Sequence, residues 1–286
     1  MKEALNRLVG GLKNYLSPPP AELPAEDERE ETPFGDVRRR LGIYLRALWD
    51  CEFVIRQSGV DMLGNEVSEP FIENFVINLP GAYPDYTADS GKQISGTEIY
   101  RAAAAHAAAH LINTKQRFSS RSLDRLQVAM ISLVEDARVE ALSVPQFPGL
   151  HRLWAAQHIA TPQDNSSARD YLNRLARALL DESYRDDDPW VCKGREWFGA
   201  VADLEDDRLS TEIGLRLADA FREKRLKLGA QPDRSRALYR DDNRFLWRRR
   251  GEPMEVVNPY FRSNSAIGLE KDGGKNSKSK PELIID

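Results

Sequence analysis

Residues 101 to 110 read RAAAAHAAAH, and they hold seven alanines and two histidines, His106 and His110, four positions apart. Alanine has the highest intrinsic helix propensity, so the stretch predicts a helix. Residues four apart stand on the same helical face, and His106 and His110 share that face with Ile99 and Ala103. Because alanine side chains add little bulk, a second helix can approach closely. The stretch therefore predicts an interior helix that carries two inward-facing imidazoles.

Two imidazoles at this spacing can bind one Zn²⁺, and the next predicted helix offers a third ligand. The buried stripe of that helix consists of Leu126, Met130, Leu133, Ala137 and Ala141. On a helical wheel Glu140 falls on the buried side, Asp136 falls at its edge, and Glu135 points away. A carboxylate on an apolar face requires a cation, a metal or strong donors. We therefore predict a metal site made of His106, His110 and Glu140, with Zn²⁺ as the expected ion.

The same residues also allow a metal-free interpretation. The two histidines can hydrogen-bond to Asp136 and Glu140 and form a buried polar network that fixes the register of the two helices. Metal-dependent hydrolysis is disfavoured, because the metalloprotease signature places a general-base Glu directly after the first histidine. This chain has Ala107 at that position.

Around this stretch the pattern is mostly helical. Ser95 and Glu98 form a capping box, and Ser122 is a suitable cap for a helix that runs to about Leu142. Further helices are predicted at 36–57, 150–159, 167–183, 190–205 and 210–227. Residues 59–95 are rich in Gly, Pro and Asp, with one short extended segment at 71–77. The expected fold is mostly α, with a multi-helix domain over residues 36–262.

The two ends of the chain differ from this domain in composition. Residues 1–16 place Leu5, Leu8, Val9, Leu12 and Leu16 on one stripe and predict an amphipathic helix. Residues 17–33 hold several prolines and six acids against one arginine, which indicates a solvated linker. Residues 263–286 are poor in apolar side chains and are expected to be a disordered tail.

Composition excludes several classes of protein. Of 286 residues, 41% are hydrophobic and 30% charged, with a net charge of −4, which argues against a nucleic-acid partner. We expect no membrane span and no secretory signal, because no apolar run approaches the ~20 residues that a bilayer requires. Two distant cysteines, Cys51 and Cys192, cannot form a disulfide framework, so the expected location is the cytoplasm. The chain also lacks a phosphate-binding Gly-rich loop and a Gly-x-Ser-x-Gly elbow.

Several motifs in one order resemble the amino-terminal helical region of the CbbO/NorD family. The motifs are Tyr83-Pro84-Asp85, residues 96–111, residues 135–142, Phe147-Pro148-Gly149-Leu150, Leu153-Trp154 and, more loosely, residues 239–244. Members of that family are large cytoplasmic adaptors that work with a ring-forming MoxR-type AAA+ ATPase. CbbO-type proteins recruit that motor to inhibited Rubisco, and NorD-type proteins serve the maturation of nitric oxide reductase.

One departure from the family pattern limits what the resemblance implies. The family carries a von Willebrand factor A domain with an Asp-x-Ser-x-Ser metal site, and this sequence contains no such motif. Its target-gripping function is therefore not carried over. The resemblance implies a non-catalytic adaptor that docks on a MoxR-type AAA+ hexamer and couples it to remodelling of a target enzyme, with Rubisco favoured. Residues 1–16 and 17–33 are the candidate docking elements.

Three alternatives stay open. The first is a NorD-like factor for nitric oxide reductase. The second is a zinc-dependent hydrolase, or a degenerate zincin-like metalloprotein, built on His106, His110 and Glu140. The third is a scaffold without a motor partner.

Overall fold

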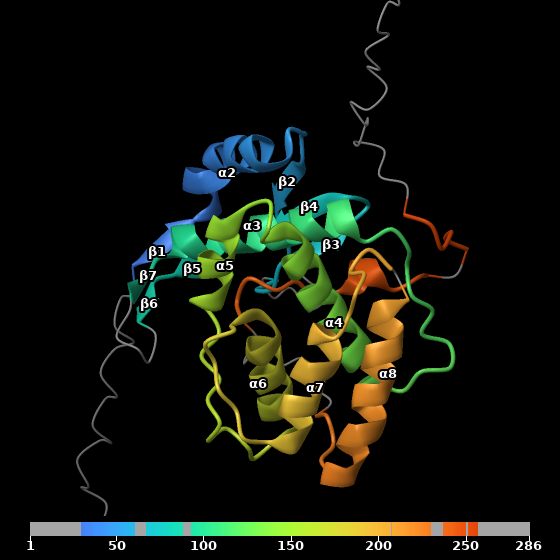
Figure 1. Ribbon diagram of the computed structural model, residues 1–286. Coiled ribbons are helices and arrows are strands. Elements are labelled where there is room, and N and C mark those ends of the chain that lie inside the picture. The colour runs from blue at the N-terminus through green and yellow to red at the C-terminus, as the bar shows by residue number, and fades with distance from the viewer. Residues whose placement is uncertain are drawn as a thin grey trace, which may run out of the picture.

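The computed structural model describes residues 30–60, 67–87, 93–206, 208–229, 237–249 and 251–256. The predicted amphipathic helix 1–16, most of the linker 17–33 and the tail 263–286 lie outside the described residues. Within the described residues there are seven α-helices (Figure 1). They are α2 (Phe34–Trp49), α3 (Gly96–Asn113), α4 (Arg125–Ser143), α5 (Pro148–Ala155), α6 (Ala168–Leu180), α7 (Pro189–Gly199) and α8 (Leu209–Phe221). Short 3₁₀ turns follow at Arg222–Lys224 and Arg244–Leu246. The prediction of a helix-rich fold is confirmed.

The prediction of a single extended segment is wrong, because three small sheets are present. The strands are β1 (Glu31–Pro33), β2 (Val54–Gln57), β3 (Phe71–Glu73), β4 (Val76–Leu79), β5 (Ala82–Pro84), β6 (Tyr86–Thr87) and β7 (Gln93–Ile94). β1 pairs antiparallel with β5, β6 pairs antiparallel with β7, and the third sheet has the order β2-β4-β3. These strands are two to four residues long, too short for alternation to reveal them.

Local turn geometry explains two further differences in this region. Asn74 and Phe75 both have positive φ, so the chain reverses there and divides the predicted segment 71–77 between β3 and β4. Asp50 adopts a left-handed conformation with φ 49. It ends α2 at Trp49, well before the predicted end at residue 57, and β2 follows.

Helix caps are local features, and the sequence placed one of its two predicted caps correctly. The Ser95–Glu98 capping box at the start of α3 is present. Helix α4 is capped by Asp124, with Gln127 completing the box, two residues after the predicted cap at Ser122. Pro148 begins α5, where proline is well accommodated in the first helical turn.

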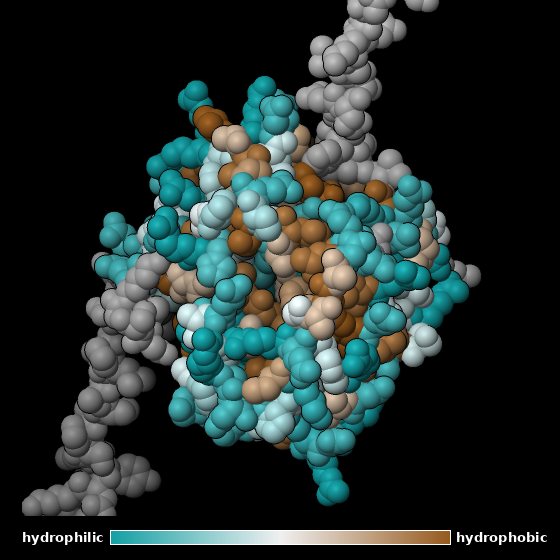
Figure 2. Space-filling view, in the orientation of Figure 1, coloured by the Kyte–Doolittle hydropathy of each residue, from teal (hydrophilic) through white to brown (hydrophobic). Residues whose placement is uncertain are grey.

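Helix α4 connects two hydrophobic clusters. The first gathers α2, α3, α5 and the strands and includes Ile131 and Val139 of α4. The second gathers α6, α7 and α8, called the bundle below, and includes Met130, Leu133 and Val134 of α4. In Figure 1 the bundle lies below α3, and α4 runs from the level of α3 down beside it. Hydrophobic residues reach the surface in the middle of this face (Figure 2).

A close approach between α8 and α4 depends on a glycine. A Cβ added at Gly214 would lie 2.7 Å from the Cα of Ile131, which is backbone and cannot rotate away. The small residue therefore sets the distance between these two helices. Among the described helices, none is both long enough and apolar enough to span a bilayer.

Candidate metal centre

Helix α3 points both predicted histidines into the interior. The side chains of His106 and His110 are completely or almost completely buried, and their ring centroids lie 4.7 Å apart. All seven alanines between positions 102 and 109 are buried as well. Because no bulky side chain intervenes, the indole Nε1 of Trp154 reaches the backbone and donates a 3.0 Å hydrogen bond to the carbonyl of Ala102. The prediction of an interior alanine-rich helix is confirmed.

Helix α4 brings three carboxylates to this region, one more than the helical wheel indicated. Asp136 and Glu140 are 3% and 0% exposed, and Glu135, which was predicted to point away, is 1% exposed. Glu135 accepts 2.7 Å hydrogen bonds from the guanidinium of Arg138 and from the hydroxyls of Thr114 and Ser210. The prediction failed because α4 contacts α3, α5, α6 and α8 and is enclosed on nearly every side.

Residues 239–243 complete the site from far along the chain. Arg240 makes a two-pronged contact with Glu140, with Nη2 at 2.7 Å from Oε2 and Nε at 3.1 Å from Oε1. The Tyr239 hydroxyl donates to the same carboxylate at 2.8 Å. Glu140 thus has the cation that its burial requires, and the cation is a guanidinium. We call the residues His106, His110, Asp136, Glu140, Tyr239, Arg240 and Asp241 the polar centre.

Four groups of the polar centre could hold a metal ion: His106, His110, Asp136 and Asp241. Their ligand atoms all lie within 4.8 Å of one another. From His110 Nε2 the distances are 3.2 Å to Asp136 Oδ1 and 3.9 Å to Asp241 Oδ1, and from His106 Nε2 they are 3.8 and 3.7 Å. A tetrahedral ion with bonds of about 2.0–2.2 Å separates its ligands by about 3.3–3.6 Å. The four histidine–aspartate distances lie near this range, so the group could hold Zn²⁺.

The outer ring nitrogens of both histidines face polar partners. The Thr114 hydroxyl donates to Glu135, so its oxygen accepts from Nδ1–H of His110 at 3.2 Å. Nδ1 of His106 lies 3.2 Å from Glu140 Oε1, although the angle there falls outside hydrogen-bond range. Both arrangements direct the Nε2 lone pairs toward the two aspartates. Such outer partners are typical of metal-bound histidines, whose orientation and basicity they fix.

The charges of the site leave a negative excess inside the protein. In the count of charges, Arg138 and Arg240 offset Glu135 and Glu140, and Asp136 and Asp241 add two further negative charges, although Arg240 also lies 3.6 Å from Asp136. A divalent cation neutralises these two carboxylates fully while both imidazoles stay neutral. Protons on the histidines are the alternative, since an uncompensated pair of buried charges is costly.

The pKa shifts of the buried groups agree with this excess of negative charge. Burial alone lowers the pKa of His106, but the favourable interactions with the carboxylates of Asp136 and Glu140 outweigh it and raise the pKa to about 9. Burial would raise the pKa of Asp136, yet the two histidines and Arg240 hold it well below its usual range. Burial likewise acts on Glu140, and Arg240 with His106 lowers its pKa to about 2. For Asp241, burial is the main cause of a raised pKa.

Two of the three predicted metal ligands thus belong to the four-ligand group, and Glu140 lies outside it, against the opposite nitrogen of His106. Asp136 and Asp241 take its place. Asp241 had one signal in the sequence, its position within the Tyr239–Arg244 motif. No local pattern could show that this motif folds back onto α3.

No family model, curated protein or solved structure matches this chain. The fold and the site define it as a helix-rich protein with small accessory sheets and a buried His₂Asp₂ group that could hold a metal ion.

Proposed function

We propose that the polar centre binds one divalent ion, with Zn²⁺ the first choice, and that the ion stabilises the fold. The observation that carries this proposal is the convergence of two imidazoles and two carboxylates on one point of the interior. Four protein ligands fill a tetrahedral zinc and leave no position for a water molecule, which is the pattern of structural sites. The position after His106 is Ala107, so the general base of a zincin hydrolase has no counterpart there. We therefore favour a structural ion over hydrolysis.

We further propose that the module is the non-catalytic part of a cytoplasmic adaptor for a MoxR-type AAA+ hexamer. The support is the resemblance to CbbO/NorD proteins, and most of the residues that carry it are buried in this fold, whereas Arg101, Pro148, Gly149 and Arg244 are exposed. Trp154 stacks near Tyr239, and Tyr83 packs against Tyr100 with centroids 4.6 Å apart. Such residues preserve a fold and do not contact a partner. Residues 1–16 and 17–33 remain the candidates for the docking surface. Rubisco is the favoured target, and nitric oxide reductase is the alternative.

Elemental analysis of the full chain, purified without a histidine tag, tests the metal proposal. We expect about one equivalent of Zn²⁺ per chain, with most of it lost in His110→Gln. His151→Gln is the matched control, because the ring of His151 bonds to the Leu180 carbonyl and is not one of the four ligands. Full occupancy in His110→Gln, or no bound metal in the wild-type protein after growth with zinc, would refute the proposal.

Co-purification with a MoxR-type ATPase tests the adaptor proposal. We expect the full chain to bind the hexamer and to stimulate its ATP hydrolysis. A chain without residues 1–29 should lose both effects while it keeps its fold, since β1 starts at Glu31. Reactivation assays with inhibited Rubisco and with nitric oxide reductase then separate the two targets. Unchanged binding by the shortened chain would remove the assignment of the docking elements, and absence of binding by the full chain would remove the adaptor.

A further inference from the structure

An open groove of about 430 Å³ lies between α2, α5 and the first turns of α3. In Figure 1, α2 lies above α5. We call this space the α2–α5 groove, and the lining side chains that matter below are Tyr44, Leu48, Arg101, Phe147, Arg152 and Leu153.

Much of the groove is apolar and accessible at the same time. Tyr44, Leu48, Phe147 and Leu153 line it, and each keeps part of its surface exposed. Apolar side chains gathered in one concave, accessible place are typical of a surface that contacts another segment or another protein.

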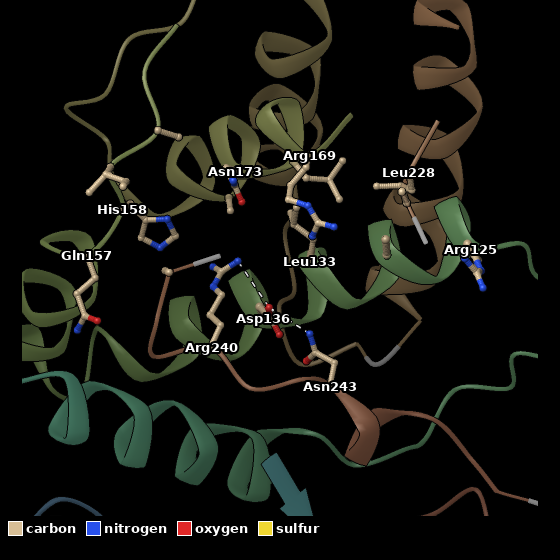
Figure 3. A pocket seen from close by; sticks show the side chains of 17 residues that line it. Arg125, Leu133, Asp136, Gln157, His158, Arg169, Asn173, Leu228, Arg240 and Asn243 are labelled. Carbon is tan, nitrogen blue, oxygen red and sulfur yellow. Dashed lines mark hydrogen bonds and ion pairs between the residues drawn. The ribbon is translucent and has the colours of Figure 1, made fainter. Parts of the chain in front are cut away.

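The charged groups of the groove differ from those of the cavity beside Asp136, which Figure 3 shows. In that cavity dashed contacts join Arg240 and Asn243 to Asp136, so its polar groups bind one another. In the groove, Arg101 and Arg152 are exposed, and neither forms an ion pair with a residue that the structure describes. The groove therefore combines an apolar surface with two available cations.

The first residues of the chain match both properties. Residues 1–16 are predicted to be a helix with one apolar stripe, Leu5, Leu8, Val9, Leu12 and Leu16. A helix this short is marginal in water, and its two central glycines weaken it further, so it requires a surface to pack on. Residues 17–31, which follow, hold six acids against one arginine.

The remaining charges do not oppose this match. On a helical wheel Arg7 lies opposite the apolar stripe, and Lys2 and Lys13 lie at its edges, where long side chains can keep their ammonium groups in water. Glu98, the acid of the groove, accepts hydrogen bonds from the backbone N–H and the hydroxyl of Ser95.

The described chain begins close to the groove. Thr32 of β1 lies against the first turn of α3, since a Cβ added at Gly96 would be 2.8 Å from the Cβ of Thr32. Arg101 follows Gly96 by five residues, which is about 7.5 Å along the helix axis. Residues 17–29 can span about 40 Å when extended, at ~3.1 Å per residue. Residues 1–16 can therefore reach the groove.

We propose that the α2–α5 groove holds residues 1–16 of the same chain, with the apolar stripe against Leu48 and Leu153. The acids of residues 17–31 then lie near Arg101 and Arg152. The carboxyl-terminal tail is the poorer occupant, because it has few apolar side chains and leaves from the far end of α3, where Val256 bonds to Lys115.

This contact goes beyond the adaptor proposal, because it concerns the chain on its own. If the adaptor proposal also holds, the ATPase and the groove compete for residues 1–16. The docked form is then autoinhibited.

Hydrogen exchange of the full chain, without any ATPase, tests the docked segment. We expect the backbone amides of residues 1–16 to exchange at least about tenfold more slowly than in an unstructured chain of the same sequence. The slowing should be the same at low and high protein concentration, because the segment and the groove belong to one molecule. Absence of slowing would overturn the proposal. Slowing that grows with concentration would assign the segment to a second copy and would overturn it as well.

Three full-length variants locate the contact. Leu12→Glu changes the segment and Leu153→Glu changes the groove, so each should restore fast exchange of residues 1–16. Arg152→Glu alters an exposed position that the fold does not depend on, and repulsion of the acids should reduce the slowing about two- to fivefold. Ile43→Glu is the control, because Ile43 is 62% exposed on α2 and does not line the groove. If Leu153→Glu and Arg152→Glu both exchange as the wild-type protein does, the segment lies elsewhere and the proposal is overturned.

Discussion

The polar centre and the bundle are built on the same helix but are stabilised in opposite ways. Toward the bundle, α4 contributes Met130, Leu133 and Val134 to an apolar cluster. Toward α3 and residues 239–243 it contributes Asp136 and Glu140, both inside a network of charged partners. An apolar cluster usually tolerates a substitution that keeps the side chain hydrophobic and conserves its volume. A buried charge depends on its partner, because removing that partner leaves it in a medium of low dielectric.

Glu135 joins these two regions. It binds Thr114 at the end of α3, Arg138 on its own helix and Ser210 of α8. Arg138 in turn donates to the backbone carbonyls of Asn113 and Leu204. The bundle and the polar centre are therefore connected by hydrogen bonds as well as by the shared helix.

The largest expected effect comes from breaking the ion pair of the polar centre. Glu140→Ala leaves the buried guanidinium of Arg240 without its main acceptor, and such a loss costs about 3–5 kcal/mol in the free energy of unfolding. Urea denaturation measures the change. Glu205→Ala is the control, since its partner Lys115 is exposed and a surface pair contributes at most about 1 kcal/mol. Equal losses in the two variants would contradict this view of the polar centre.

The second-largest expected effect distinguishes a protonated His106 from a metal-bound His106 in the polar centre. In metal-free protein the pKa of His106 is about 9, above its unfolded value of 6.5. The protonation of His106 therefore contributes fully to the free energy of unfolding below pH 6.5. This contribution, on the order of 3 kcal/mol, is lost as the pH rises to 9. With Zn²⁺ bound the ring cannot take up a proton, so stability should stay level across this window and fall below pH 6.5. Urea denaturation between pH 6.5 and 9, with EDTA or with zinc, gives the comparison, and identical curves would contradict a metal at His106.

A smaller effect is expected from crowding the bundle. In Gly214→Ala the new methyl group meets the backbone of Ile131, and α8 has to move away from α4. Overpacking of this kind costs about 1–3 kcal/mol. Gly149→Ala, where nothing lies within 4 Å, should be neutral or stabilise α5 by up to about 1 kcal/mol. Thermal unfolding of both variants tests the difference, and a neutral Gly214→Ala would show that the two helices are not in close contact.

The smallest effect concerns a helix end in the bundle. Ser167 caps α6, and its hydroxyl accepts from the backbone N–H of Asp170. Ser167→Ala should lower the free energy of unfolding by about 1 kcal/mol, while the zinc content stays unchanged because α6 provides none of the four ligands. Ser167→Thr keeps the hydroxyl and should behave like the wild-type protein. A loss of metal in Ser167→Ala would mean that the bundle and the polar centre are more tightly coupled than their separate clusters indicate.

The predictions from sequence were accurate where the decisive interactions are local. The order of the helices and the capping box at Ser95 followed from neighbouring residues alone. Apart from the extended segment 71–77, which β3 and β4 divide, the strands were missed because they are very short and depend on distant partners, as when β1 pairs with β5. The helical wheel of α4 failed for a related reason. It assumes one buried face and one solvated face, and Glu135 lies on a face that α8 and Thr114 cover.

The sequence alone determined that an alanine-rich helix would carry His106 and His110 into the interior. Helix propensity and the four-residue spacing act within a single segment, so they need no knowledge of the rest of the chain. Only the tertiary structure decided which carboxylates meet these rings. Asp241 reaches them because residues 239–243 return to α3, and Glu140 is drawn to Arg240 by the same return. Contacts between distant segments depend on how all the helices pack together, and a one-dimensional pattern does not contain that packing.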